Sequence, residues 1–112
     1  MPIFISQGRY SRDAIKGMIA NPEDRAEAAG RLFAAAGGKL LSYYVTLGEY
    51  DWLIVSEFPD HQAVSAAVLA AAGSGAVTDV RTTLAMTGAE AKGVFAASGK
   101  AARAYRPPGR AT

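Results

Sequence analysis

Residues 47–55, LGEYDWLIV, constrain the fold of this chain more than any other stretch. They read as a tight polar turn that leads directly into the most apolar strand of the sequence. A strand-like run at residues 39–46 comes before the turn, so the two runs predict an antiparallel β-hairpin. Gly48 can adopt a positive φ at little cost, and the Asp51 carboxylate can accept hydrogen bonds from nearby backbone amides. Both properties suit a turn that fixes the register of the hairpin.

Side-chain alternation predicts that both faces of the hairpin are apolar. In its first strand one face carries Leu41, Tyr43 and Val45, and the other carries Leu40, Ser42 and Tyr44. In its second strand one face carries Trp52, Ile54 and Phe58, and the other carries Leu53, Val55 and Glu57. Residues 2–10 predict another strand of this kind, because Ile3, Phe4 and Ile5 are consecutive. A strand that is apolar on both faces is typical of one that is covered on two sides.

Helical patterns separate these strands. Ser11 can cap a helix that is interrupted at Pro22, since proline lacks an amide donor and disfavours a helical residue before it. A helix restarts at Pro22 with Glu23 and Asp24 in its first turn, which predicts either one kinked helix or a short helix followed by a longer one. The inner stripe of this restarted helix is Ala26, Ala29, Phe33 and Ala36.

The second half of the chain continues the alternation of helix and strand. Asp60 can cap a helix with one apolar stripe, and its alanines would let it sit close to a sheet. The stripe consists of Val64, Ala67, Val68 and Ala71. Residues 77–86 are rich in β-branched side chains and predict the last strand. Thr87 and Glu90 form a capping-box pattern, which predicts a short C-terminal helix with Val94 and Phe95 on its apolar side.

The predicted order, β-α-β-β-α-β followed by a helix, indicates an α+β, ferredoxin-like fold with a four-stranded antiparallel sheet. Right-handed crossovers place the helices on one face of the sheet and the first and third strands at its centre. The other face would then expose more apolar surface than a monomer usually tolerates. We therefore expect a homodimer in which the open sheet faces of two copies close into a dimeric α/β barrel.

Composition limits the classes of site and location. The chain has 112 residues, enough for one domain, and no cysteine, which excludes disulfides, cysteine-ligated zinc, iron–sulfur clusters and thiol catalysis. The single histidine, His61, stands at a predicted helix start, so the sequence indicates no metal site and no cofactor. It shows no signal peptide, and its longest apolar run is too short to cross a bilayer, so we expect a cytoplasmic protein.

Charge is distributed unevenly along the chain. Residues 99–112 contain four basic side chains and no acid, whereas residues 1–98 contain eight basic and ten acidic side chains. The four basic residues are Lys100, Arg103, Arg106 and Arg110. We interpret residues 1–98 as the domain and residues 99–112 as a basic, flexible and solvated tail. The alternative is a contact with nucleic acid or a membrane surface, for which the sequence gives no strong indication.

Aromatic residues on the predicted strands are candidates for ligand binding. Tyr43, Tyr44 and Trp52, together with Tyr10, offer aromatic walls with a few polar groups, as small-molecule cavities do. Strand alternation places about half of them against the helices as core residues in any case. The sequence therefore predicts a cavity without determining which of these rings would face it.

Polar groups at the turn and in the last strand complete the candidate site. Glu49, Tyr50 and Asp51 can place a phenol and two carboxylates at the mouth of a barrel. In the alternative that we favour, Asp51 caps the turn and Tyr50 packs against a neighbouring strand or the partner subunit. Arg81 lies in an apolar and threonine-rich strand, where its guanidinium needs an anion. That anion can be the carboxylate of Glu57 or Asp79 or a bound ligand, unless the strand is an edge that reaches solvent.

The turn and its flanking residues resemble a known family. Gly48-Glu49-Tyr50-Asp51, between the YYVTL run at residues 43–47 and an apolar strand, resembles the signature of the small bacterial GYD domain proteins. The resemblance extends over residues 2–98 and implies a dimeric α/β barrel whose biochemical role is not established. Proteins of similar architecture include cofactor-free monooxygenases, lactone isomerases and ligand-sensing domains of regulators. A shared fold does not transfer a reaction from one of these to another.

Three classes of function remain open. The favoured class is a small homodimeric domain that binds a small organic molecule in its barrel. The second is a cofactor-independent monooxygenase- or isomerase-type enzyme that uses Tyr50, Asp51 or His61 as acid–base groups. The third is a structural or interaction module with a filled core. A cavity with convergent polar side chains would favour the first two classes, and a packed interior would favour the third.

Overall fold

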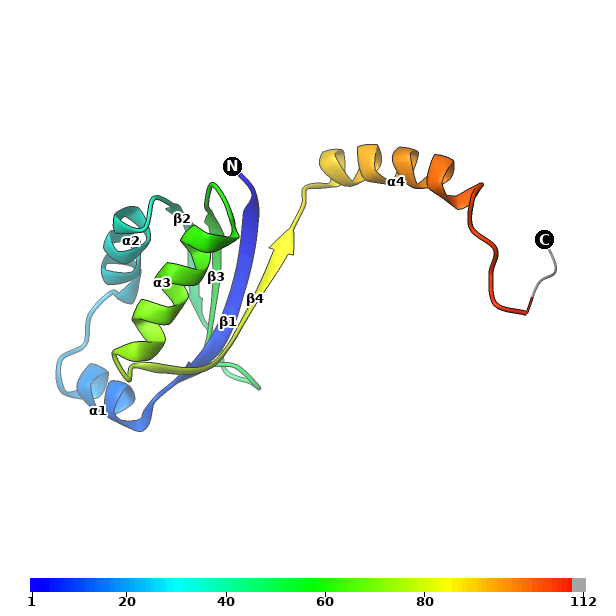
Figure 1. Ribbon diagram of the computed structural model, residues 1–112. Helices are drawn as coiled ribbons and strands as arrows, with labels where there is room; N and C mark the ends of the chain where they lie inside the picture. Colours follow the sequence, from blue (N-terminus) through cyan, green and yellow to red (C-terminus); the bar gives the residue numbers. More distant parts are fainter. Residues whose placement is uncertain (110–112) are drawn as a thin grey trace.

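Four antiparallel strands form one sheet in the order β2–β3–β1–β4 in the computed structural model, which describes residues 1–109 (Figure 1). The strands are β1 (Ile3–Tyr10), β2 (Lys39–Val45), β3 (Trp52–Glu57) and β4 (Val77–Ala85). This order confirms the α+β, ferredoxin-like prediction, with β1 and β3 at the centre of the sheet. Closure into a barrel needs a second copy of the chain and stays a prediction.

Helices α2 and α3 cover one face of this sheet, α1 lies on the same side near the end of β1, and a fourth helix stands apart (Figure 1). The helices are α1 (Arg12–Ala20), α2 (Arg25–Ala35), α3 (His61–Gly73) and α4 (Gly88–Ala102). Ser11 and Asp60 cap α1 and α3 as predicted, and Thr87 and Glu90 form the predicted capping box of α4. Within residues 1–109 none of the helices is both long enough and apolar enough to span a bilayer.

The segment predicted as one kinked helix or two helices forms two, α1 and α2. The second helix begins at Arg25, because the Asp24 carboxylate accepts a hydrogen bond from the amide of Ala26 at 2.9 Å and so occupies the N-cap position. The prediction of a start at Pro22, with Glu23 and Asp24 inside the first turn, is therefore wrong. Glu23 and Asp24 both precede α2, and Asp24 is the last residue of the irregular segment that connects α1 to α2.

The core lies between the covered face of the sheet and helices α2 and α3. Its buried apolar residues are Phe4, Phe33, Trp52, Ile54, Phe58, Val64 and Ala67. Phe58 is fully buried, and its ring centroid lies 5.2 Å from that of Phe33 and 6.4 Å from that of Phe4. A Cβ added to Gly38 would overlap the Phe58 ring. The glycine that follows α2 is thus needed for close packing and not only to end the helix.

A β-bulge in β2 changes the predicted alternation of the hairpin. Leu40 pairs with Ser56 and Tyr43 pairs with Ile54, so Leu40 and Tyr43 lie on the same, covered face. The ladder register shifts between Leu40 and Ser42, because the bulge adds one residue to β2. The prediction that Leu40 and Tyr43 point to opposite faces is therefore wrong. The alternation predicted for β3 is confirmed, since Trp52, Ile54 and Ser56 are buried and their neighbours are half-buried.

The opposite face of the sheet, called here the open face, carries the residues that alternate with the buried ones. Its aliphatic side chains in the central strands are Ile3, Ile5, Leu53 and Val55. Leu41 and Tyr44 of β2 extend this apolar area and are exposed. Helices α1, α2 and α3 all lie on the other side of the sheet (Figure 1). An apolar sheet face is thus left without a covering layer from α1, α2 or α3.

Helix α4 extends away from the rest of the chain as an arm (Figure 1). The described chain measures 64 × 30 × 22 Å, with a Cα radius of gyration of 18.4 Å. A compact chain of this length would have a radius of gyration of about 13 Å. None of the α4 residues is buried. The molecule thus consists of a folded body, residues 1–87, and an arm. The last residues of the predicted tail, 110–112, lie outside the described residues.

Candidate functional site

A cavity of about 610 Å³ lies between the covered face of the sheet and helices α1, α2 and α3. Much of its wall is apolar, with Met18, Leu32, Phe33, Ile54 and Val68 contributed by four different elements. Small residues of α2 and α3, among them Ala29 and Ala71, line it as well. The alanines expected to let α3 approach the sheet closely therefore also leave space beside it.

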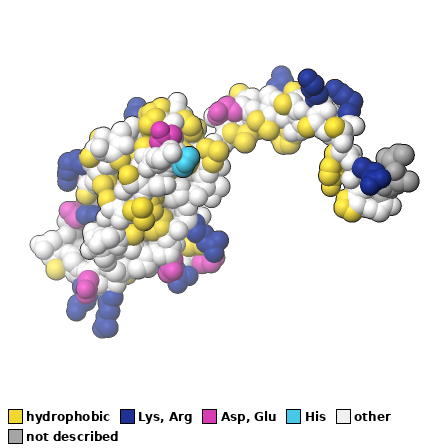
Figure 2. Space-filling view, viewed as in Figure 1, with side chains coloured by type: hydrophobic (Ala, Val, Ile, Leu, Met, Phe, Trp, Pro, Cys, Tyr) yellow, Lys and Arg dark blue, Asp and Glu magenta, His cyan; other side chains and the backbone are white. Residues whose placement is uncertain are grey.

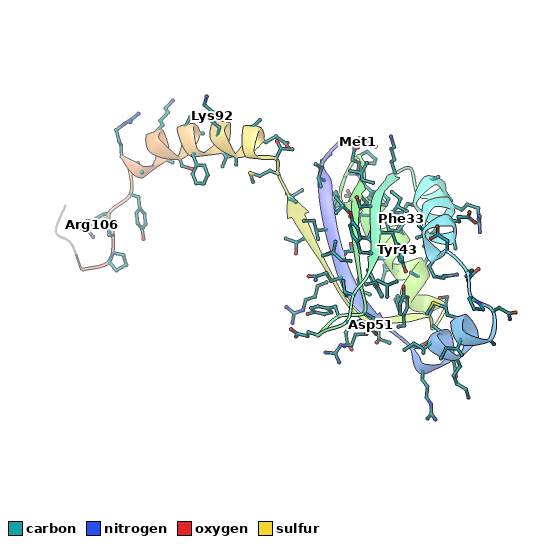
Figure 3. All side chains as sticks on the ribbon, turned by 180° about the vertical axis from the view of Figure 1, so that it is seen from behind. Met1, Phe33, Tyr43, Asp51, Lys92 and Arg106 are labelled. Carbon is teal, nitrogen blue, oxygen red and sulfur yellow. The ribbon has the colours of Figure 1, made fainter. Side chains whose placement is uncertain are left out.

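Two tyrosines form the polar part of the cavity wall. The hydroxyl groups of Tyr10, at the end of β1, and Tyr43, in β2, are hydrogen-bonded to each other. Burial raises the pKa of the Tyr43 phenol well above its ordinary value, and the bond to Tyr10 raises it further. Tyr43 is therefore a neutral phenol in neutral solution. Figure 3 shows Tyr43 and Phe33 between the sheet and the helices.

Trp52, the single tryptophan of the chain, lies on the same wall. Its indole ring packs over Gly8 of β1 so closely that a Cβ on Gly8 would overlap it. The side chain is only 5% exposed, and its Nε1 has no hydrogen-bond partner within residues 1–109. A buried donor without an acceptor is rare and costs free energy. Trp52 thus lines the wall with its ring, and its Nε1 is a buried donor that the described residues leave unsatisfied.

Formal charge is confined to one side of the cavity. Among the residues that line it, only Glu23 and Arg25 are charged, and they form an ion pair of 2.7 Å. Their side chains are 54% and 35% exposed, so the pair lies in contact with solvent where α1 connects to α2. The remaining polar groups of the wall include the hydroxyl of Ser6, which is hydrogen-bonded to the hydroxyl of Thr82 at 2.9 Å. The interior therefore suits an uncharged molecule.

The turn at residues 46–51 fastens the hairpin to the end of β1. The Asp51 carboxylate accepts a hydrogen bond from the backbone amide of Tyr10 at 2.9 Å, and the amide of Asp51 donates to the carbonyl of Gly8 at 2.8 Å. Thr46 closes the turn through its amide and hydroxyl, which donate to the carbonyls of Asp51 and Tyr50 at 2.8 and 2.6 Å. Asp51 thus holds Tyr10, and with it the phenol pair, beside the cavity.

Two details of the predicted turn are wrong. Gly48 does not have a positive φ, whereas Gly37 and Gly75 do. The backbone amide bound by the Asp51 side chain belongs to Tyr10, which is distant in sequence, and not to a neighbour in the turn. Because Thr46 closes the turn with two hydrogen bonds, the left-handed conformation expected of Gly48 is not needed.

A second, polar cavity of about 340 Å³ lies beside the turn. Arg9, Glu49, Tyr50, Asp79 and Arg81 contribute to its wall. Arg81 is exposed on the outer strand β4, next to Asp79, which has a φ of 53° where the β1–β4 register shifts. This geometry agrees with the interpretation of Arg81 as a residue of an edge strand that reaches solvent.

The six candidate ligand-binding residues do not form one site. Tyr43 and Trp52 line the larger cavity, and Tyr50 and Arg81 line the smaller one. Asp51 lines neither cavity, and Tyr44 is 59% exposed. Tyr44 belongs to the open face, because it pairs with Leu53. Their roles in binding stay predictions.

The groups considered for acid–base chemistry are also separated. Tyr50 lines the smaller cavity, while Asp51 and His61 line neither. His61 is exposed at the first position of α3. Within residues 1–109 no group of three histidine, cysteine or acidic side chains is arranged to hold a metal ion.

Sequence reasoning did not single out several residues of the larger cavity. Met18 and Arg25 come from helices on which the sequence pattern emphasised caps and inner stripes. The run of alanines at residues 70–72 was the available signal, because small side chains on a helix facing large aromatic rings leave volume unfilled.

Comparison with known proteins identifies the family. The model of the GYD domain matches residues 4–95. The chain belongs to the GYD domain family. A relative from Thermus thermophilus, named glutamine synthetase and cystathionine beta-lyase binding protein, is 32% identical to this GYD protein over 77 residues. That match covers 69% of this chain and 81% of the relative.

Solved structures agree with the fold of this GYD protein. A transcriptional regulator from Neisseria meningitidis, solved as a complex with L-Met, aligns with 78% of this chain at 21% identity and a TM-score of 0.54. The protein MtbAldR aligns with 77% of this chain at 12% identity and a TM-score of 0.55. The GYD chain spans about half the length of each, 51% and 52%. At these identities the likeness shows a shared fold alone.

Proposed function

We propose that this GYD protein is a homodimer that binds a small, uncharged and mainly apolar organic molecule in the cavity beneath α1, α2 and α3. The observation that carries the proposal is the wall formed by Tyr10, Tyr43 and Trp52. It brings a hydrogen-bonded pair of phenols and an indole ring to a largely apolar cavity. Ligand sites typically combine an apolar lining with a few placed polar groups of this kind.

The size of the cavity supports a small organic ligand. Its volume of about 610 Å³ falls within the range of about 300–1,000 Å³ that is typical of small-molecule sites. A packed interior, which the purely structural class of function would require, does not describe this region. The ligand would be enclosed by the sheet on one side and by helices on the other.

The chemistry of the wall supports an uncharged ligand with a hydrogen-bond acceptor. A buried charge needs a partner, and the charged residues of the lining, Glu23 and Arg25, already pair with each other near solvent. In the phenol pair one hydroxyl donates to the other, so one hydroxyl hydrogen is left to donate to a ligand. A carbonyl, ether or hydroxyl oxygen on an otherwise apolar frame would match these groups.

The open face supports the homodimer. Ile3, Ile5, Leu53 and Val55 lie side by side on the two central strands, and Leu41 extends the area to β2. Large continuous apolar areas on a soluble protein usually mark an interface. A two-fold axis through the open face would cover the same residues on both copies, because a two-fold interface is self-complementary.

A fluorescence titration tests the ligand proposal with the neutral dye N-phenyl-1-naphthylamine. Trp52 is the single tryptophan, so energy transfer from it reports dye in the cavity. The variant Ala71→Phe fills the cavity, and Ala66→Phe is a matched control, because Ala66 is exposed on the same helix outside the lining.

We expect saturable dye emission and Trp52 quenching in the parent protein and in Ala66→Phe, and neither in Ala71→Phe. The anionic dye 1-anilinonaphthalene-8-sulfonate should bind more weakly than the neutral one. Equal binding of the neutral dye to all three proteins would place it outside the cavity and contradict the proposal. Native mass spectrometry of the purified protein complements the titration by revealing any ligand that is retained.

A second candidate function is the binding of another protein, as the name of the Thermus thermophilus relative describes for that protein. The exposed apolar side chains of the open face favour it as well. Mixing this protein with a purified bacterial glutamine synthetase in a sedimentation experiment tests this candidate. If this protein co-sediments with the synthetase as a dimer, whose open face is covered, then both the ligand-binding homodimer and the binding of another protein are retained. Co-sedimentation of a monomer would favour the interaction module.

A further inference from the structure

Helix α4 lacks the contacts that normally stabilise a helix in a folded protein. None of its residues is buried, and Val94 and Phe95 are 49% and 75% exposed. Its capping box satisfies the first turn, with Thr87 Oγ1 accepting from Glu90 N at 3.1 Å and Glu90 Oε1 accepting from Thr87 N at 2.9 Å. Most helical stability in proteins comes from the packing of an apolar face. For α4 no such packing exists within residues 1–109.

The sequence of α4 is a poor isolated helix. It has 15 residues, a length at which even alanine-rich helices are marginal in water. Gly93 and Gly99 lie in its interior, and each makes helix formation about fivefold less favourable than alanine would. Beyond the helix's own backbone, no described atom lies within 4 Å of a Cβ built at either glycine, so close packing does not require a glycine there. A helix of this composition needs a surface to pack against.

The two sides of α4 differ in chemistry. One side of α4 is an apolar stripe, because four of its apolar residues recur at helical spacing. These residues are Ala91, Val94, Phe95 and Ala102. The basic side chains Lys92, Lys100 and Arg103 fall on the opposite side. Figure 2 shows this division, with hydrophobic atoms along the lower side of α4 and Lys and Arg atoms along its upper side. The stripe is the side that would pack.

The arm leaves the body on the side of the open face. Helices α1, α2 and α3 lie to one side of β1 and β4 in Figure 1, and α4 extends away on the other side. Only Met86 and Thr87 separate β4 from α4. Ala85 and Thr83 of β4 pair with Ile3 and Ile5 of the open face, so the arm leaves the sheet at the edge of that face. A second copy seated on the open face would lie within reach of α4.

The charge and the length of α4 are compatible with packing against a second copy. Residues 1–87 carry seven basic and nine acidic side chains, whereas residues 88–112 carry five basic and one acidic. The basic side chains of α4 lie opposite its stripe, so they stay in solvent when the stripe packs. The length also fits, since α4 extends about 22 Å and a sheet of four strands spans about 14 Å between its outer strands.

We propose that α4 is an exchanged clamp, which packs its apolar stripe against the body of the other copy in the homodimer. This inference rests on the proposed homodimer, to which it adds a second interface besides the open face. By two-fold symmetry each copy then holds its partner with its own arm. The stripe, centred on Val94 and Phe95, lies against the partner body, and the basic side faces outward.

Two matched substitutions test the clamp. Phe95→Asp places a charge in the stripe, and Ala96→Asp places the same charge on the basic side of the same helix. We expect Phe95→Asp to raise the dimer dissociation constant about tenfold or more, which corresponds to about 1.4 kcal/mol. Ala96→Asp should change it by less than about threefold. Sedimentation velocity over a concentration series measures both constants.

Cross-linking identifies the surface that α4 meets. The chain has four lysines: Lys16 and Lys39 in the body, and Lys92 and Lys100 in α4. Dimers assembled from unlabelled and ¹⁵N-labelled chains, treated with disuccinimidyl suberate, should yield mixed-isotope links between an α4 lysine and a body lysine. Links found only within one isotope would show that α4 folds back on its own body, which overturns the clamp.

The remaining outcomes distinguish a failure of the clamp proposal from a failure of the homodimer proposal. A stable dimer with equal dissociation constants for Phe95→Asp and Ala96→Asp overturns the clamp and leaves the homodimer standing. A parent protein that is monomeric at all concentrations overturns both. If hydrogen exchange in α4 slows only when phosphatidylglycerol vesicles are added, a lipid surface is the partner of the stripe and the clamp is again overturned.

Discussion

Both faces of the sheet carry apolar side chains, but they differ in their polar groups and in what covers them. The covered face contains Ser6, Ser56 and the Tyr43 phenol and borders a cavity, whereas the open face presents a row of aliphatic side chains. The covered face also carries the buried core residues Phe4, Trp52 and Ile54, whereas no helix among α1, α2 and α3 covers the aliphatic row. This difference indicates that the covered face is arranged for a guest molecule and the open face for another protein surface. Each of the following predictions probes one side of that division.

The largest expected effect is a charge placed on the open face. Val55 lies at the centre of the sheet, between Ile5 of β1 and Ser42 of β2. In a dimer closed through this face, Val55→Asp would bury an unpaired carboxylate at a cost of several kcal/mol, so the dissociation constant should rise about 100-fold or more. Size-exclusion chromatography with light scattering measures the change.

Leu69→Asp is the control for this substitution, because Leu69 is 70% exposed on α3, away from the open face. It should leave the assembly unchanged. A dimer that persists in Val55→Asp would show that the two copies do not meet through the open face.

On the covered face the next largest effect is expected at Gly8. In Gly8→Ala the new Cβ would overlap the indole of Trp52, and overpacking of this kind costs about 1–3 kcal/mol. The midpoint of urea unfolding should fall, and the emission of Trp52 should shift because its ring is displaced.

Gly48→Ala is the matched control for Gly8→Ala. No atom lies within 4 Å of a Cβ at Gly48, and its φ is not positive, so stability should change by less than about 0.5 kcal/mol. A large loss of stability in Gly48→Ala would contradict the account of the turn in which Thr46 provides the closing hydrogen bonds.

A smaller effect is expected at the junction between the turn and β1. Asp51→Ala removes the acceptor of the Tyr10 amide and should cost about 1–2 kcal/mol in the free energy of unfolding. Glu49→Ala, at an exposed position in the same turn, should cost almost nothing. If Asp51→Ala weakens dye binding without any loss of stability, Asp51 acts on the ligand and not on the fold.

The smallest effect concerns the pH dependence of stability. The pKa of Tyr43 is raised in the folded state by burial, whereas in the unfolded chain it is about 10. Above pH 10 the unfolded chain therefore releases the Tyr43 proton, while the folded state still retains it. The free energy of unfolding is unaffected by ionisation of Tyr43 below pH 10 and falls as the pH rises above 10. Tyr43→Phe should flatten the decline in stability above pH 10, as followed by thermal unfolding. An unchanged slope would contradict the burial of the phenol.

Much of the fold could be predicted because the local signals agree with one another. Helix caps at Ser11 and Asp60, and the capping box at Thr87, mark helix starts that the structure confirms. The bulge in β2 could not be predicted, because Leu40 and Leu41 are both apolar and either can face the core. Its position depends on pairing with β3, which is a tertiary property.

The candidate site was predictable only in its residue types. Tyr43 and Trp52 were identified as aromatic wall residues, but the contact between Tyr10 and Tyr43 depends on how β1 and β2 flank β3. The separation of Tyr44 from Tyr43 follows from strand alternation and was foreseeable once the register was known. The position of α4 was not predictable, because an apolar stripe shows that a helix packs without showing on what.

The outer edge of β4 has a consequence for how this protein avoids fibre formation. An exposed edge strand offers unpaired amides and carbonyls to further strands, and a bulge or a charged side chain makes it a poor template. The register shift near Asp79, with its φ of 53°, and the guanidinium of Arg81 introduce both irregularities into β4. Growth of the sheet by strand addition at β4 is thereby disfavoured.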